Sequence, residues 1–103
     1  MVTIEQISFQ IILHSGNARS SAMEALMHAK KGEFAIAEEK LAEAKKELNE
    51  AHHHQTSLIQ AEARGEAHNI NVLLIHAQDH LMNAIVVKDL AIEFVELYQR
   101  LEK

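Results

Sequence analysis

The sequence predicts an all-α fold, and three observations support this. The chain has no proline and only 3 glycines in 103 residues, so few positions interrupt a helix. Alanine, leucine, glutamate and lysine, all strong helix formers, dominate the composition. Hydrophobic residues make up 48% of the chain, enough for a packed core, and aromatic residues only 4%. At this length we expect a single domain over residues 1–103.

Two glycine-containing breaks divide the chain into three helices. Gly32 follows Lys30 and Lys31, as is typical of a helix end, and Gly65 is the expected left-handed residue of the second break. The predicted helices run roughly over 3–31, 33–63 and 68–102. Because both connections are short, we expect an antiparallel up-down three-helix bundle.

The first two helices carry clear inward-facing patterns. Thr3 and Gln6 have the spacing of a capping box, and Gly16 costs about 1 kcal/mol relative to alanine, which indicates a packing or functional reason for it. In the second helix Gln55 is the one polar member of a coiled-coil-like seam, so it should face inward and need a partner. The seam comprises Phe34, Ala37, Leu41, Ala44, Leu48, Ala51, Gln55 and Leu58.

The third helix, for which Asn69 is the expected cap, is apolar on opposite faces. One face carries Leu74, Leu81, Ile85 and Ile92. The other carries an apolar seam interrupted by a polar cluster: Val72, His76, Asp79, His80, Asn83, Val87, Leu90, Phe94 and Leu97. A bundle of this size cannot cover both faces of its own third helix, so the pattern predicts a homo-oligomer.

Composition also excludes several classes of function. The formal net charge is −5 and no basic stripe is present, so we expect no nucleic-acid partner. Cysteine is absent, which excludes disulfides and thiolate chemistry. The first ten residues do not resemble a signal peptide and no apolar run reaches transmembrane length, so a cytoplasmic protein is expected.

The polar cluster of the third helix has two chemical interpretations. Imidazoles at i and i+4 share a helix face, so His76, Asp79 and His80 could bind a metal such as zinc. A neutral imidazole can also attack phosphorus and form a phosphohistidine, with a neighbouring polar group fixing its tautomer. Spacing alone leaves both interpretations open. The run His52–His54 spreads around the helix, so we expect solvated histidines and not a chelating face.

Three stretches resemble one family. "HAQDHLM" at 76–82 with the following "VVKDLAIEFVELYQRL", "SGNARSSAMEAL" at 15–26 and "AHHHQTSLIQAEARGE" at 51–66 are similar to the lactose/cellobiose class of the IIA component (type 3) of the phosphoenolpyruvate-dependent sugar phosphotransferase system. "GEFAIAEEKLAEA" at 32–44 fits the region between them, so the resemblance covers nearly the whole chain.

The resemblance implies a phosphotransferase component that works only with partner proteins. His76 would accept a phosphoryl group from phospho-HPr and pass it to a cysteine of IIB, which phosphorylates a β-disaccharide (cellobiose, another β-diglucoside or lactose) during uptake through the membrane protein IIC. Asp79 would be the metal-site residue, with one divalent cation, Mg²⁺, on the axis of a homotrimer formed through the third helix. His80 and Gln55 are possible supporting residues.

Two alternatives come from other classes. One is a histidine phosphotransfer domain of two-component signalling, although the lysine expected near the histidine is missing, since Lys88 is too far along the chain. The other is a structural bundle with His76, Asp79 and His80 as zinc ligands. For Arg19, a surface salt bridge is favoured over a role in holding an anion.

Overall fold

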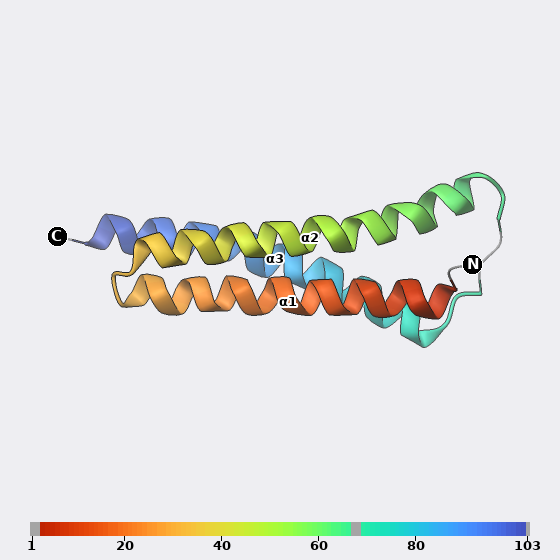
Figure 1. Ribbon diagram of the computed structural model, residues 1–103, viewed down its shortest axis with the longest axis horizontal. Coiled ribbons are helices and arrows are strands. Elements are labelled where there is room, and N and C mark those ends of the chain that lie inside the picture. Colours follow the sequence, from red (N-terminus) through yellow and green to blue (C-terminus); the bar gives the residue numbers. More distant parts are fainter. Residues whose placement is uncertain (1–2, 67–68, 103) are drawn as a thin grey trace.

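The fold is a bundle of three long helices connected by short loops. The computed structural model describes residues 3–66 and 69–102, and these form α1 (Ile4–Lys30), α2 (Phe34–Ala63) and α3 (Val72–Leu101). Figure 1 shows that consecutive helices run in opposite directions, as an up-down-up arrangement. The predicted all-α, three-helix class is therefore confirmed, and the bounds of α1 and α2 agree with the prediction within one residue.

Local signals explain where α1 and α2 begin and end. The Thr3 hydroxyl accepts a hydrogen bond from the Gln6 N–H (3.1 Å), and the Gln6 side chain accepts one from the Thr3 N–H (2.9 Å), which confirms the capping box. Gly32 and Gly65 adopt φ values of 76° and 86°, in the left-handed region that favours glycine. Both glycines lie just beyond a helix end, as predicted.

The start of α3 differs from the prediction. Residue 68, the predicted first residue, lies outside the described residues, and Asn69 and Ile70 are not helical. The cap is Asn71 and not Asn69: the Asn71 side chain accepts a hydrogen bond from the Leu74 N–H at 2.9 Å. Either asparagine has the right chemistry for this position. Asn71 directly precedes Val72, where the helical backbone begins.

The core is built largely from alanines, which let the helix axes approach closely. The predicted inward seam of α2 is confirmed, with Gln55 and Phe34 half-buried and its other members buried. Two layers of buried residues follow each other along the bundle. The first contains Ile11, Ala18, Leu48, Ala51, Leu58, Ala77, Leu81 and Ala84. The second contains Ala22, Ala25, Ala29, Ala37, Leu41, Ala44, Ala91 and Val95.

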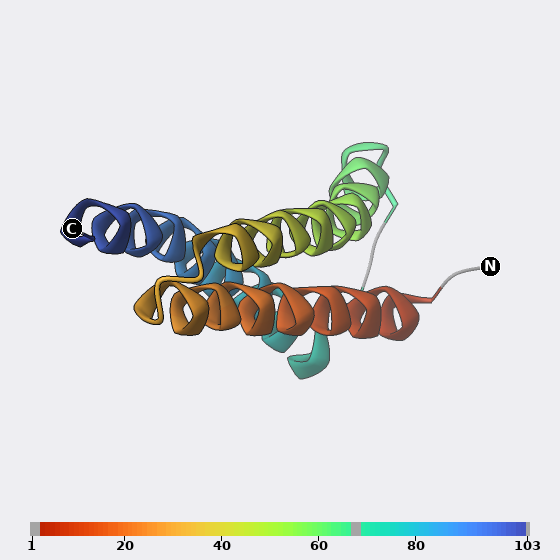
Figure 2. The same cartoon turned by 60° about the vertical axis from the view of Figure 1, so that its left-hand side comes forward.

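The bundle is elongated and one helix connects the other two. Its extents are 57 × 20 × 19 Å and its radius of gyration is 16.1 Å, against about 13 Å for a compact domain of this length. α1 contacts both α2 and α3 extensively, whereas α2 and α3 share fewer contacts. In Figures 1 and 2, α3 begins on the far side of α1 from α2 and crosses to lie near the start of α2.

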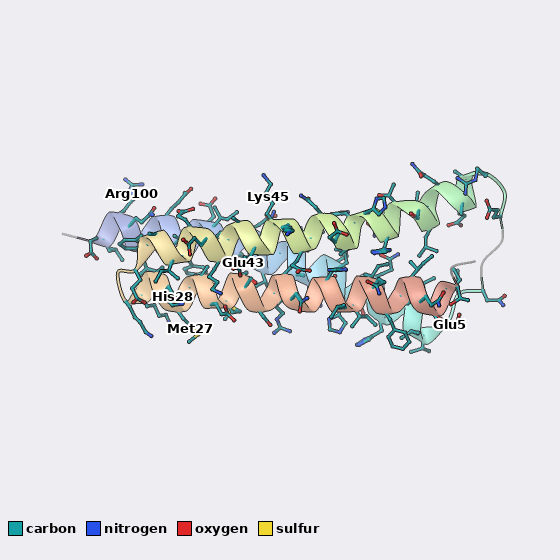
Figure 3. All side chains as sticks on the ribbon, in the orientation of Figure 1. Glu5, Met27, His28, Glu43, Lys45 and Arg100 are labelled. Atoms are coloured by element: carbon teal, nitrogen blue, oxygen red, sulfur yellow. The ribbon has the colours of Figure 1, made fainter. Side chains whose placement is uncertain are left out.

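A continuous apolar surface remains exposed on α1 and α3, and we refer to it as the apolar face. On α3 it comprises Ile75, Met82, Val86, Leu90, Phe94 and Leu97, and on α1 it comprises Phe9, Leu13, Met23 and Met27. Met23, Met27 and Phe94 line the same groove, so the two stripes adjoin. In Figure 3, Met27 projects from α1 on the side away from α2. Val87 was predicted on this face but packs against the second core layer.

The outer surface of α2 is charged, as predicted for residues 38–50. Lys45 points away from the bundle in Figure 3. Lys40 is within 3.0 Å of Glu24 and 3.4 Å of Glu43, and these two contacts raise the pKa of its ammonium group. Within residues 3–66 and 69–102, no helix is both long enough and apolar enough to cross a membrane.

Candidate functional site

A polar pocket lies between α1 and α3, at the middle of the apolar face. Ser15 and Arg19 of α1 line one side of it, and the polar cluster of α3 lines the other. Each group occupies consecutive turns of its helix, because residues three or four apart share a face. The residues of α3 are His76, Asp79, His80 and Asn83. The predicted cluster is therefore confirmed as one surface, whereas the contribution of α1 was missed.

His76 and His80 form a close imidazole pair. Their Nε2 atoms are 3.0 Å apart, and the rings meet nearly at right angles (88°) with centroids 4.4 Å apart. For a hydrogen bond to exist at this contact, one Nε2 must carry a proton and the other a lone pair. At least one ring of the pair is therefore neutral. His76 is exposed and His80 half-buried, so His76 is the more accessible nucleophile.

Two groups of α1 add anion-binding capacity to this pocket. The Ser15 hydroxyl is buried (1% exposed) and has no hydrogen-bond partner in the part of the chain that the structure describes. Arg19 was expected to form a surface salt bridge, but this expectation is wrong within the described residues, where no acidic group lies within ion-pair distance of it. The sequence contained a signal for the pair, because Ser15 and Arg19 are one turn apart on the helix.

Asp79 lies within the apolar stripe on α3, one turn after its first member, Ile75. With about 3.6 residues per turn, it continues the row formed by Ile75, Met82 and Val86, and it is exposed. No ion pair to Asp79 is present among residues 3–66 and 69–102. A carboxylate in the middle of an apolar row would be costly to bury alone, so covering this face requires a counter-charge.

Gln55 lies outside the pocket within one chain. Its side-chain amide donates a hydrogen bond to the side-chain oxygen of Gln78 at 2.6 Å, and both side chains are half-buried. This contact confirms that Gln55 faces inward and has a partner, and it connects α2 to α3. Neither glutamine lines the pocket with His76.

A second polar cluster lies between α1 and α2, and the sequence did not predict it. Ligand atoms of His14, Glu50 and His54 lie within 4.8 Å of one another, so this cluster could hold a metal ion. The His52–His54 run was expected to be solvated, which holds for His52 and His53, whereas His54 is half-buried. Burial, followed by the neighbouring His14 and His53, lowers the pKa of His54. This imidazole therefore favours its neutral form.

The fold and pocket can now be compared with known proteins. Residues 6–99 match the family described as "PTS system, Lactose/Cellobiose specific IIA subunit". The chain belongs to this family. It is a IIA phosphotransferase component, a phosphocarrier of the sugar phosphotransferase system. Family membership supports phosphoryl transfer over the signalling and purely structural alternatives.

Individual members of the lactose/cellobiose IIA family are similar over nearly their full length. The lichenan-specific phosphotransferase enzyme IIA component of Bacillus subtilis is 58% identical over 98 residues, which are 95% of this chain and 89% of that protein. The crystal structure of the cellobiose-specific enzyme IIA from Bacillus anthracis superimposes with a TM-score of 0.92 at 64% identity, covering 98% of this chain and 94% of that one.

One structural relative was solved together with a partner. The chitobiose IIA protein of Escherichia coli, in complex with HPr, matches with a TM-score of 0.86 at 37% identity, and the match covers 100% of both chains. A homologue of this chain therefore binds HPr. The resemblance noted in the sequence is confirmed by all of these matches.

Proposed function

We propose that this IIA component carries the phosphoryl group on Nε2 of His76. The observation that supports this most directly is the His76–His80 pair, because its short Nε2 contact requires a neutral ring. The same pocket contains the guanidinium of Arg19, which has no ion-pair partner among the described residues. Attack by the His76 lone pair forms a new N–P bond while the N–P bond of the HPr phosphohistidine breaks. The HPr imidazole leaves with the electron pair of that bond. A cysteine thiolate of IIB then takes the phosphoryl group by the same exchange.

The other pocket residues have the chemistry to hold a phosphoryl group. Arg19 can donate hydrogen bonds to two phosphoryl oxygens at once, and the Ser15 hydroxyl has a free proton to donate. His80 contacts the nitrogen that would be phosphorylated, so it must turn aside to admit the phosphorus atom and can then donate to an oxygen. These groups favour the phosphorylated state without any metal in the pocket.

The apolar face supports assembly as a homotrimer through α3. Three copies would bury the rows around Leu90, Phe94 and Leu97 and bring three Asp79 carboxylates together on the axis. One divalent cation, Mg²⁺, would offset their repulsion, with water completing an oxygen-rich coordination shell. Gly16 lies in the exposed row of α1, and nothing lies within 4 Å of the position of an added Cβ, so its space is free for a neighbouring copy. A supporting role for Gln55 would then have to act across a subunit boundary.

The partners and substrate class follow from the relatives. HPr is the proposed donor, since the Escherichia coli homologue binds it, and IIB is the proposed acceptor, with IIC as the permease. The relatives named above are specific for lichenan, cellobiose and chitobiose. We therefore infer that a β-linked disaccharide is the sugar, and that the chain works in the cytoplasm, where it meets HPr.

Onward transfer tests this function directly. The purified phosphorylated chain is mixed with IIB, and labelled phosphoryl groups are followed on both proteins. We expect rapid movement of the label to IIB and none to a IIB variant whose active cysteine is serine. His76→Gln should never acquire label, whereas His53→Gln, which removes an exposed histidine outside the pocket, should behave as the wild type. Release of label as inorganic phosphate at the same rate with and without IIB would contradict the relay.

A further inference from the structure

The cluster formed by His14, Glu50 and His54 lies outside the pocket proposed for the phosphoryl relay. It lies between α1 and α2, whereas the phosphoryl pocket lies between α1 and α3. The two imidazoles, His14 and His54, are half-buried and Glu50 is exposed. The three side chains lie beside one another. We propose that His14, Glu50 and His54 bind one zinc-class divalent transition-metal ion, and that this ion cross-links α1 to α2.

The geometry brings two imidazoles and one carboxylate close together. Glu50 and His54 are one turn apart on α2, so their side chains share a face, and His14 faces them from α1. The His14 and His54 rings are nearly parallel (11°), with centroids 6.0 Å apart. Ligand atoms within 4.8 Å need only side-chain rotation to reach the spacing of about 3.3 Å that tetrahedral zinc requires at bond lengths near 2.0–2.1 Å.

Glu47 prepares His14 for this role. The Nδ1 atom of His14 is 2.6 Å from a carboxylate oxygen of Glu47, and a carboxylate can only accept, so Nδ1 carries the proton. In the neutral ring the lone pair of His14 is then on Nε2, where a metal ion can take it. Both side chains are mostly covered, with 20% and 29% exposed, so the contact holds the ring in place. A carboxylate behind a ligating imidazole is the usual support for a zinc ligand.

The ligand set selects the class of ion. Two imidazoles and one carboxylate favour zinc and its neighbours, whereas Mg²⁺ prefers oxygen ligands only. Three protein ligands leave a fourth position for water. The site differs in both location and preferred ion from the Asp79 site proposed for Mg²⁺, and it does not depend on phosphoryl transfer.

The His76–His80 pair could also bind zinc, so the test must separate the two sites. The chain, without an affinity tag and stripped of metal by a chelator, carries His76→Gln and His80→Gln as a common background. Zn²⁺ is titrated by calorimetry, and Co²⁺ is titrated in parallel because its visible absorption reports tetrahedral coordination. We expect one Zn²⁺ per chain in this background, with a rise in the unfolding temperature that ethylenediaminetetraacetate reverses.

Matched variants then assign the ligands. His54→Gln and Glu50→Gln should each abolish binding and the rise in unfolding temperature, whereas His52→Gln, which removes an exposed histidine of the same helix, should leave both unchanged. Glu47→Gln should weaken binding by about 10- to 100-fold. Circular dichroism checks that each variant keeps its helices. Absence of Zn²⁺ binding in the background, or unchanged affinity in His54→Gln, would overturn the proposal.

Discussion

Arg19 is the residue whose role changes most between sequence and structure. It lies beside His76 and His80 in the pocket, with no acidic partner in the described parts of the chain. A guanidinium can stabilise a dianionic phosphoryl group by charge and by paired hydrogen bonds, which is the role proposed for Arg19.

Arg19→Gln should slow phosphoryl transfer from HPr by roughly 10- to 100-fold, because a hydrogen bond to a charged group contributes about 1.5–3 kcal/mol. The rate is measured with purified phospho-HPr in rapid-quench experiments. Arg100→Gln, at the exposed end of α3, is the matched control and should transfer at the wild-type rate. Equal rates for the two variants would show that Arg19 does not contact the phosphoryl group.

Asp79 offers a second test at the level of single residues. Asp79→Leu should abolish Mg²⁺ binding yet keep or strengthen the proposed trimer, because it removes carboxylates that would repel one another on the proposed axis. Sedimentation velocity gives the assembly state, and thermal unfolding with and without Mg²⁺ reports the cation. Asp89→Leu, which removes a carboxylate paired with Lys88 on the same helix, should keep the response to Mg²⁺. Monomeric Asp79→Leu would contradict an axial carboxylate.

Spacing along one helix predicted the α3 half of the pocket but not the α1 half. His76, Asp79 and His80 share a face because helical periodicity is a local property of the chain. Ser15 and Arg19 lie beside these residues only because α3 packs against that part of α1. This contact depends on how the two helices pack and not on spacing along one helix. The His14–His54 contact was missed for the same reason, since its members come from different helices.

At the level of the helices, boundaries were predictable where glycine marks them. Gly32 and Gly65 end α1 and α2 because only glycine adopts their left-handed backbone without strain. The start of α3 could not be predicted in this way, because Asn69 and Asn71 are chemically equivalent caps two residues apart. Only the folded backbone distinguishes them.

Asn71→Ala should therefore destabilise the protein by about 1 kcal/mol, since it leaves the Leu74 N–H without its acceptor. Asn69→Ala is the matched control and should change stability by only a few tenths of a kcal/mol, about what substitution of an exposed surface residue costs. Urea unfolding followed by circular dichroism measures both. A larger loss for Asn69→Ala than for Asn71→Ala would mean that α3 begins earlier than the structure indicates.

At the scale of the whole molecule, the sequence predicted that α3 has apolar residues on two opposite faces, and the structure agrees. One bundle was expected to cover only one of these faces of α3. In the single chain the second face is exposed, together with the adjoining apolar residues of α1. The elongated shape of the bundle agrees with this need, because a thin three-helix rod has little interior of its own.

Leu97→Glu should dissociate the proposed trimer into monomers, because three carboxylates would replace apolar contacts near the axis. Ile59→Glu substitutes an equally exposed apolar residue of α2 away from the apolar face, so it should leave the assembly intact. Sedimentation velocity distinguishes these outcomes. A monomeric wild-type protein, or a trimeric Leu97→Glu variant, would contradict assembly through α3.

The central claim is that His76 is the phosphoryl acceptor, and intact-mass spectrometry tests it most directly. The chain is incubated with phosphoenolpyruvate, the general phosphotransferase enzyme and HPr, and its mass is compared with that of a sample lacking HPr. We predict the gain of one phosphoryl group per chain, dependent on HPr and absent in a folded His76→Ala variant. A phosphorylated His76→Ala chain, or an unmodified wild-type chain beside an active control IIA protein, would contradict the assignment.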